Sequence, residues 1–172
     1  MRPGALLAVL ILLLPTALNA QEIRKSQLAS VSQMVGTARI EIVYRRPVAH
    51  GRDLFGALVP WGHIWSPGSD SAAVFTTTKD LDLAGARLPA GRYSLWMIPD
   101  KDFFTLIFNS VTPAFHLRYT EGKDVLRVRL KAHAGNQMET LAFYFPFVDA
   151  DAAVLAMHWG RTVVLMPFRA KQ

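Results

Sequence analysis

Apolar and polar side chains alternate along much of the chain, and this alternation predicts β-strands. Residues 39–45 place Ile40, Ile42 and Tyr44 at every second position, with charged residues between them. Because successive side chains of a strand point to opposite faces, such a segment is expected to bury one face. The same criterion predicts strands at 26–35, 39–45, 72–78, 81–84, 87–88, 92–98, 103–109, 124–131, 138–148, 152–159 and 162–168.

Short strands separated by turn signals are typical of an antiparallel β-sandwich, and a closed β-barrel is the alternative. Gly36 and Thr37 suit a tight hairpin turn, and Gly160 with Arg161 predicts a final hairpin between 152–159 and 162–168. No segment after residue 20 repeats apolar residues at the period of a helix over three turns. We therefore expect an all-β protein with a single β-sandwich domain at residues 28–169.

The alternation stops between residues 46 and 71, a stretch that contains three prolines, four glycines, Trp61 and Trp65. The pattern allows one helical turn at 53–58 and otherwise predicts a long loop. Loops longer than about 12–15 residues are uncommon within a domain and are often functional. The sequence thus directs attention to this loop as a binding site.

The first 20 residues resemble a secretory signal peptide. Arg2 precedes an uncharged apolar run from Ala5 to Leu14, and Ala20 offers a small residue at a cleavage point before Gln21. The run is too short for a membrane span, which needs roughly 20 residues. We expect an exported protein, periplasmic or secreted, with a flexible arm at 21–27 and no transmembrane segment after cleavage. An uncleaved N-terminal anchor is the alternative.

The charge of the chain and the distribution of its basic residues bear on whether nucleic acid is a partner. The chain has 172 residues, no cysteine and a formal net charge of +6. Basic residues are spread along the sequence, apart from a local stripe of Arg127, Arg129 and Lys131. Such a stripe could contact phosphates, but it also fits the solvent face of a sheet, which we favour. Nucleic acid is therefore not expected as a partner.

Motifs for catalysis or metal binding are lacking. The five histidines are scattered without a Cys pair or a His-Glu-x-x-His motif, and no Gly-x-Ser-x-Gly elbow occurs. We predict no catalytic residue, no metal ligand and no cofactor. A hydrolase with a distributed site, using His50 or His63, stays open because a catalytic triad can assemble from distant residues.

Binding residues are better supported than catalytic ones. Tryptophan faces stack on sugars or other flat apolar surfaces, and arginines bind carboxylates or phosphates. Arg45, at the end of the strand that precedes the loop, adds donors beside Arg46 and Arg52. In the alternative interpretation, the aromatic residues plug one end of the sandwich and Arg52 binds backbone carbonyls. Our candidate ligand-binding residues are Arg46, Arg52, Trp61, His63 and Trp65.

Several phrases of the chain resemble a known family. They are Tyr44-Arg45-Arg46-Pro47, the run from Gly51 to Trp65, Leu88 to Leu95, and Lys123 to Val128. Together these phrases resemble the bacterial family catalogued as domain of unknown function 2911, from about Ser26 to Phe168. The resemblance implies export and supplies no activity. After Trp65 the family usually reads Arg-Thr-Gly-Ala-Asn-Glu-Ala, whereas residues 66–72 here keep only the glycine and the final alanine.

These observations favour an exported, non-catalytic β-sandwich that binds a small molecule, a glycan or an envelope component. This interpretation rests on the long loop, which carries aromatic residues and arginines on an otherwise regular β scaffold. An exported hydrolase and a structural protein-interaction domain are the alternatives.

Overall fold

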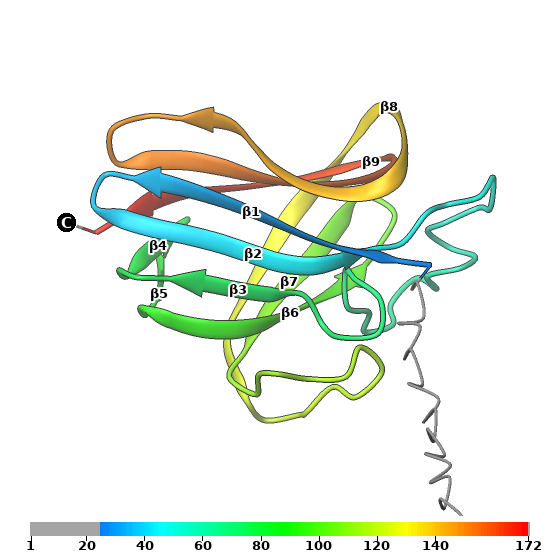
Figure 1. Ribbon diagram of the computed structural model, residues 1–172, viewed down its shortest axis with the longest axis horizontal. Coiled ribbons are helices and arrows are strands. Elements are labelled where there is room, and N and C mark those ends of the chain that lie inside the picture. The colour runs from blue at the N-terminus through cyan, green and yellow to red at the C-terminus, as the bar shows by residue number, and fades with distance from the viewer. Residues whose placement is uncertain (1–24, 172) are drawn as a thin grey trace, which may run out of the picture.

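Nine antiparallel strands form one continuous open sheet in the computed structural model, which describes residues 25–171 (Figure 1). Their order across the sheet is β1-β2-β3-β6-β7-β8-β9-β4-β5. The predicted signal peptide at 1–20 and most of the predicted arm lie outside the described residues. The strands are β1 (Gln27–Val35), β2 (Ala38–Arg46), β3 (Val74–Thr77), β4 (Leu81–Leu83), β5 (Ala86–Leu88), β6 (Gly91–Pro99), β7 (Phe103–Asn109), β8 (Asp124–Val148) and β9 (Ala152–Ala170).

The prediction of an all-β fold is confirmed, and the described residues contain no helix. The outermost strands of the sheet, β1 and β5, do not pair with each other, so the sheet is not a closed barrel. The alternation in β2 has the expected result, because Ile40 and Ile42 are fully buried and Tyr44 is nearly so. Gly36, with φ 57°, makes the turn that pairs Val35 with Ala38.

A long curled strand folds the sheet over its own core. The first part of β8 pairs with β7, and the remainder, from Ala132 onward, pairs with β9. Register shifts interrupt the β8–β9 pairing at three places. Such bulges bend a strand and increase its twist. In Figure 1, β8 accordingly passes from the layer of β6 and β7 into the layer of β9.

The core lies between the two halves of this curled sheet. Leu95 of β6 and Phe108 of β7 face Phe143 of β8 and Met157 of β9 around one narrow apolar interior. The free volume between them is only ≈ 10 Å³, so the halves are packed as closely as protein interiors usually are. The two layers over a common core correspond to the predicted sandwich, although β8 joins them into one sheet.

The predicted final hairpin is wrong. Gly160 and Arg161 lie inside β9, where Gly160 pairs with Met138 beside a register shift of β8. A Cβ atom at Gly160 would lie 2.8 Å from the side chain of Leu54. The glycine therefore marks a bulge and a close approach rather than a turn.

Two further expectations need correction. The segments 124–131 and 138–148 are parts of one strand, because Ala132, His133 and Ala134 between them pair with β9. Residues 53–58 form turns and no helix; the Val59 N–H donates to the Leu54 carbonyl at 2.8 Å, and the Gly56 N–H donates to the Val59 carbonyl at 2.8 Å. These bonds close a small loop beside the end of the core.

Candidate functional site

A groove with a volume of ≈ 1380 Å³ opens at one end of the sheet. Its walls come from the start of β1, the long loop between β2 and β3, and the loop between β7 and β8, with Trp159 of β9 at its base. In Figure 1 the long loop projects at this end, beside the point where β1 begins. Segments far apart in the sequence thus build a single concave surface.

Two of these loops are joined by reciprocal backbone and side-chain bonds. The Asp70 N–H donates to His116 Nδ1 at 3.1 Å, and the His116 N–H donates to the Asp70 carbonyl at 3.4 Å. Next to them, the Ala72 N–H donates to the Ala114 carbonyl at 2.9 Å. Because a backbone donor occupies Nδ1, the neutral His116 ring carries its proton on Nε2. The ring therefore offers a hydrogen-bond donor at its other nitrogen.

Positive charge predominates in the groove. Lys25, Arg45 and Arg52 line it, against the single carboxylate of Asp70. Arg45 has only long contacts in the described residues: its Nε lies 3.7 Å from Asp70 Oδ2, and its Nη1 donates to the Ser26 carbonyl at 3.3 Å. Well-formed charge-assisted bonds measure about 2.7–2.9 Å. The guanidinium of Arg45 thus keeps donor capacity for another acceptor.

Residues with a left-handed backbone conformation also line the groove. Three non-glycine residues in the described part of the chain have positive φ, and His50 (53°) and Asp70 (64°) both line the groove. A left-handed backbone costs roughly 1–2 kcal/mol for most L-residues, and Asp and His adopt it more readily than most. Strained residues of this kind are concentrated at functional sites.

Aromatic side chains fill the end of the core beneath the groove. Phe55 contacts the rings of Trp61, Trp65, Phe104 and Trp159. The Trp65 ring stacks on Trp159 with centroids 5.8 Å apart and planes 10° apart. The backbone N–H of Trp65 also donates to the Met97 carbonyl at 2.8 Å. This packing matches the alternative in which the aromatic residues of the loop plug one end of the sheet.

The five residues predicted from sequence do not all meet. Arg52 and Trp65 line the groove, and Arg52 donates to the carbonyls of Ala49 and Val48 at 2.7 Å each. Arg46 lies outside it and donates to the Leu141 carbonyl at 2.9 Å. Trp61 is 37% exposed, and it lies outside the groove lining together with the exposed His63. Ligand binding by these five residues stays a prediction.

The structure adds Asp70 and His116 to the candidates and gives Arg45 a place among them. Arg45 directly precedes Arg46 in the sequence. This pair of adjacent arginines was the signal that could have identified Arg45. Asp70 and His116 are 46 residues apart and belong to no motif. Only the pairing of their two loops brings them together.

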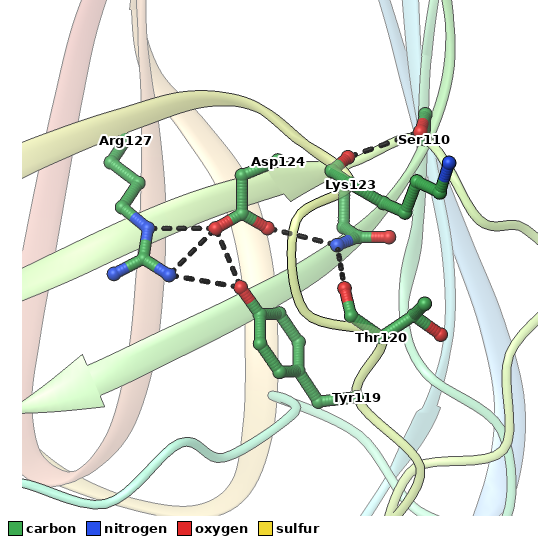
Figure 2. Close-up of polar contacts among 7 residues, drawn as sticks. Ser110, Tyr119, Thr120, Lys123, Asp124 and Arg127 are labelled. Carbon is green, nitrogen blue, oxygen red and sulfur yellow. Dashed lines mark hydrogen bonds and ion pairs between the residues drawn. The ribbon is translucent and has the colours of Figure 1, made fainter.

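A second polar cluster lies at the start of β8 (Figure 2). The Tyr119 hydroxyl and Arg127 Nε both donate to Asp124 Oδ2, and Asn109 Nδ2 donates to Asp124 Oδ1 at 2.8 Å. Partial burial raises the pKa of Asp124, but the hydrogen bonds from Tyr119, Asn109 and Arg127 outweigh it and hold the pKa below its usual range. The Tyr119 ring also packs edge-on against the buried Trp96. These satisfied contacts hold the loop between β7 and β8 against the sheet.

Two kinds of feature are missing from residues 25–171. Nowhere in this range do three His, Cys, Asp or Glu side chains come together as possible metal ligands. The same range includes no helix with the length and apolar character of a membrane span.

Comparisons with known proteins yield one family. Its model, described as "Protein of unknown function (DUF2911)", matches residues 26–168. Neither the curated proteins nor the solved structures yield a match.

Proposed function

The chain belongs to DUF2911, a family of proteins of unknown function, and we propose that it is an exported, non-catalytic protein whose small-molecule ligand occupies the groove. The groove itself is the observation that carries the proposal. Its volume of ≈ 1380 Å³ slightly exceeds the roughly 300–1,000 Å³ of ordinary ligand sites. Polar and apolar side chains line it in about equal measure, so it offers a ligand both hydrogen bonds and apolar contact.

The polar groups of the groove favour binding over catalysis. The Ser66 hydroxyl donates to the Leu95 carbonyl and accepts the Ala73 N–H, so backbone groups already occupy it. The Nδ1 atom of His116 accepts a backbone N–H and is not available as a base. Nucleophilic catalysis needs a nucleophile within hydrogen-bond reach of a base. Because backbone groups occupy Ser66 Oγ and His116 Nδ1, these two residues do not form such a pair.

Blocking the groove tests the proposal. Ser69 lines one wall and Ser26 another, and a tryptophan at either position fills space that the ligand needs. A panel of glycans and small anions is screened by thermal shift, because a ligand that binds only the folded protein raises its midpoint. We expect at least one panel member to raise the midpoint of the original protein and to lose this effect in Ser69→Trp and in Ser26→Trp.

His63→Ala is the matched control, because this exposed residue lies in the same loop but outside the groove. It is expected to leave binding unchanged. Binding that survives both tryptophan variants and disappears in His63→Ala would move the site to the tip of the loop, next to Trp61. Each comparison uses variants whose midpoint without ligand equals that of the original protein.

A further inference from the structure

We infer, building on the proposed function, that the ligand is an amphiphilic carboxylate: an aliphatic chain with a single anionic headgroup. The headgroup binds Arg45, and the aliphatic chain lies along leucines of the groove wall. The argument rests on the charge of the groove, on its exposed leucines and on the register of β1 and β2.

Cationic side chains outnumber carboxylates in the groove. Lys25, Arg45 and the Nε2 of His116 are donors, and Asp70 is the single carboxylate among the residues that line the groove. A guanidinium offers a planar pair of donors that matches a carboxylate. The long contacts of Arg45, at 3.3 and 3.7 Å, contrast with the 2.7 Å bonds that Arg52 makes to backbone carbonyls. Of the two arginines that line the groove, Arg45 is therefore the one whose donors remain poorly satisfied.

Asp70 limits the charge of the headgroup. Its carboxylate lies beside Arg45 and repels an incoming anion. A phosphate monoester carries about −1.5 to −2 charges at neutral pH, whereas a carboxylate carries one. Next to Asp70, a singly charged carboxylate therefore meets less repulsion than a phosphate monoester.

Apolar side chains form the other part of the site. Leu28, Leu58 and Leu117 line the groove and are 61%, 44% and 77% exposed. They come from three different segments of the chain, namely β1, the long loop and the loop between β7 and β8. Exposed apolar surface rimmed by polar groups is typical of a ligand-binding groove. An inorganic anion leaves these leucines uncovered.

The register of the first two strands places the two kinds of group together. Leu28 of β1 pairs directly with Arg45 of β2. Directly opposed residues of an antiparallel pair lie on the same face of the sheet. An apolar side chain and the poorly satisfied cation are thus neighbours, as the two parts of an amphiphile require.

A glycan fits the same surface less well. Sugars bind largely through stacking on an exposed aromatic face. Trp65 in the groove already stacks on Trp159 and meets Phe55 edge-on. The more exposed Trp61 lies outside the groove lining.

Calorimetric titration of the purified protein at neutral pH tests the inference. The probes are decanoate, acetate, decanol and decyl phosphate, each in its monomeric range. We expect decanoate to bind at least tenfold more tightly than any of the other three. Tighter binding of decyl phosphate would overturn the carboxylate assignment, and equal binding of decanol would remove the role of Arg45.

Variants locate the binding. Arg45→Gln is expected to weaken decanoate binding at least tenfold, and Leu117→Ser about threefold or more. Arg118→Gln is the matched control, because this exposed arginine neighbours Leu117 in sequence and does not line the groove. Lys25→Gln, at an exposed position, replaces Arg45→Gln if the latter lowers the thermal midpoint. Decanoate binding that none of the groove variants changes would overturn the inference.

The remaining outcomes separate this inference from the proposed function. If decanoate fails while another ligand binds and is blocked by Ser69→Trp, the inference falls and the proposed function stands. If nothing binds in the groove, both fall. Co-sedimentation with vesicles of anionic lipid, without binding of soluble decanoate, would identify a membrane surface as the partner and also overturn the inference.

Discussion

Three arginines that are close in sequence have different surroundings in the folded protein. Arg46 and Arg52 donate to backbone carbonyls at 2.7–2.9 Å, whereas Arg45 has only the longer contacts to Ser26 and Asp70. The bonds of Arg46 and Arg52 stabilise the loop. Arg45 is the residue of this group with donors to spare for a ligand.

Asp124 gives rise to a prediction at the same scale. Its carboxylate accepts from Tyr119, Asn109 and Arg127, and its side chain is 15% exposed. Asp124→Asn leaves some of these donors poorly satisfied. We expect the variant to lower the free energy of unfolding at neutral pH by about 1–3 kcal/mol, measured by urea denaturation.

The effect is expected to depend on pH. Because the pKa of Asp124 is lower in the folded protein than in the unfolded chain, its contribution is complete above the unfolded value of about 3.9. The contribution is lost as the pH falls from there through the folded pKa. The difference between the original protein and Asp124→Asn should therefore shrink as the pH falls below about 4. Asp102→Asn, at an exposed turn position, is the control and is expected to change little.

Among the elements, β8 has the strongest influence on the shape of the molecule. Its 25 residues pair first with β7 and then with β9, and the three register shifts lie in its second part. This strand supplies both layers of the core. It also meets the long loop, where the Ala49 N–H donates to the Glu139 carbonyl at 2.8 Å. The base of the groove is therefore coupled to the bend of β8.

A substitution at Gly135 of β8 tests how closely this strand packs on β9 at the bend. A Cβ atom there would lie 2.6 Å from the side chain of Val163 and 3.2 Å from His158 Nε2. Because Val163 is branched and almost buried, it has little freedom to move away. We expect Gly135→Ala to lower the free energy of unfolding by roughly 1–3 kcal/mol, measured by thermal or urea denaturation. Ala134→Ser, at the exposed neighbouring position, should have little effect, and equal losses in both variants would contradict the steric explanation.

On the scale of the whole molecule, export and binding are compatible. The first strand begins at Gln27 and the groove lining begins at Lys25, so cleavage before Gln21 removes none of the described residues. The groove therefore belongs entirely to the proposed mature protein.

Processing of the full-length chain is the corresponding prediction. Expression in a bacterial host with a secretion pathway should yield a protein whose N-terminus is Gln21, found outside the cytoplasm. Intact mass and N-terminal sequencing of the fractions measure this. Replacing Leu12 and Leu13 in the apolar run with arginine should keep the precursor inside, because a charged run no longer resembles a signal peptide. If the original protein stays unprocessed in the cytoplasm, this result would contradict export and leave the groove proposal untouched.

Local patterns in the sequence were sufficient for the fold class and for most strands. Side-chain alternation and turn residues depend only on neighbouring positions, so Ile40 and Ile42 revealed a buried face and Gly36 a hairpin turn without further information. The long loop after β2 was also visible, because its prolines and glycines interrupt the alternation.

Tertiary structure alone decided how these elements combine. Gly160 with Arg161 resembles a turn in the sequence, yet β9 continues through both residues and pairs there with the bulged strand β8. Asp70 meets His116 only because two distant loops pair beside the start of β1. Whether an arginine is satisfied depends on which carbonyls surround it after folding, so Arg45 could not be separated from Arg46 and Arg52 by residue type. Strand formation is a local property of this chain, whereas the groove depends on long-range pairing that local residue patterns do not reveal.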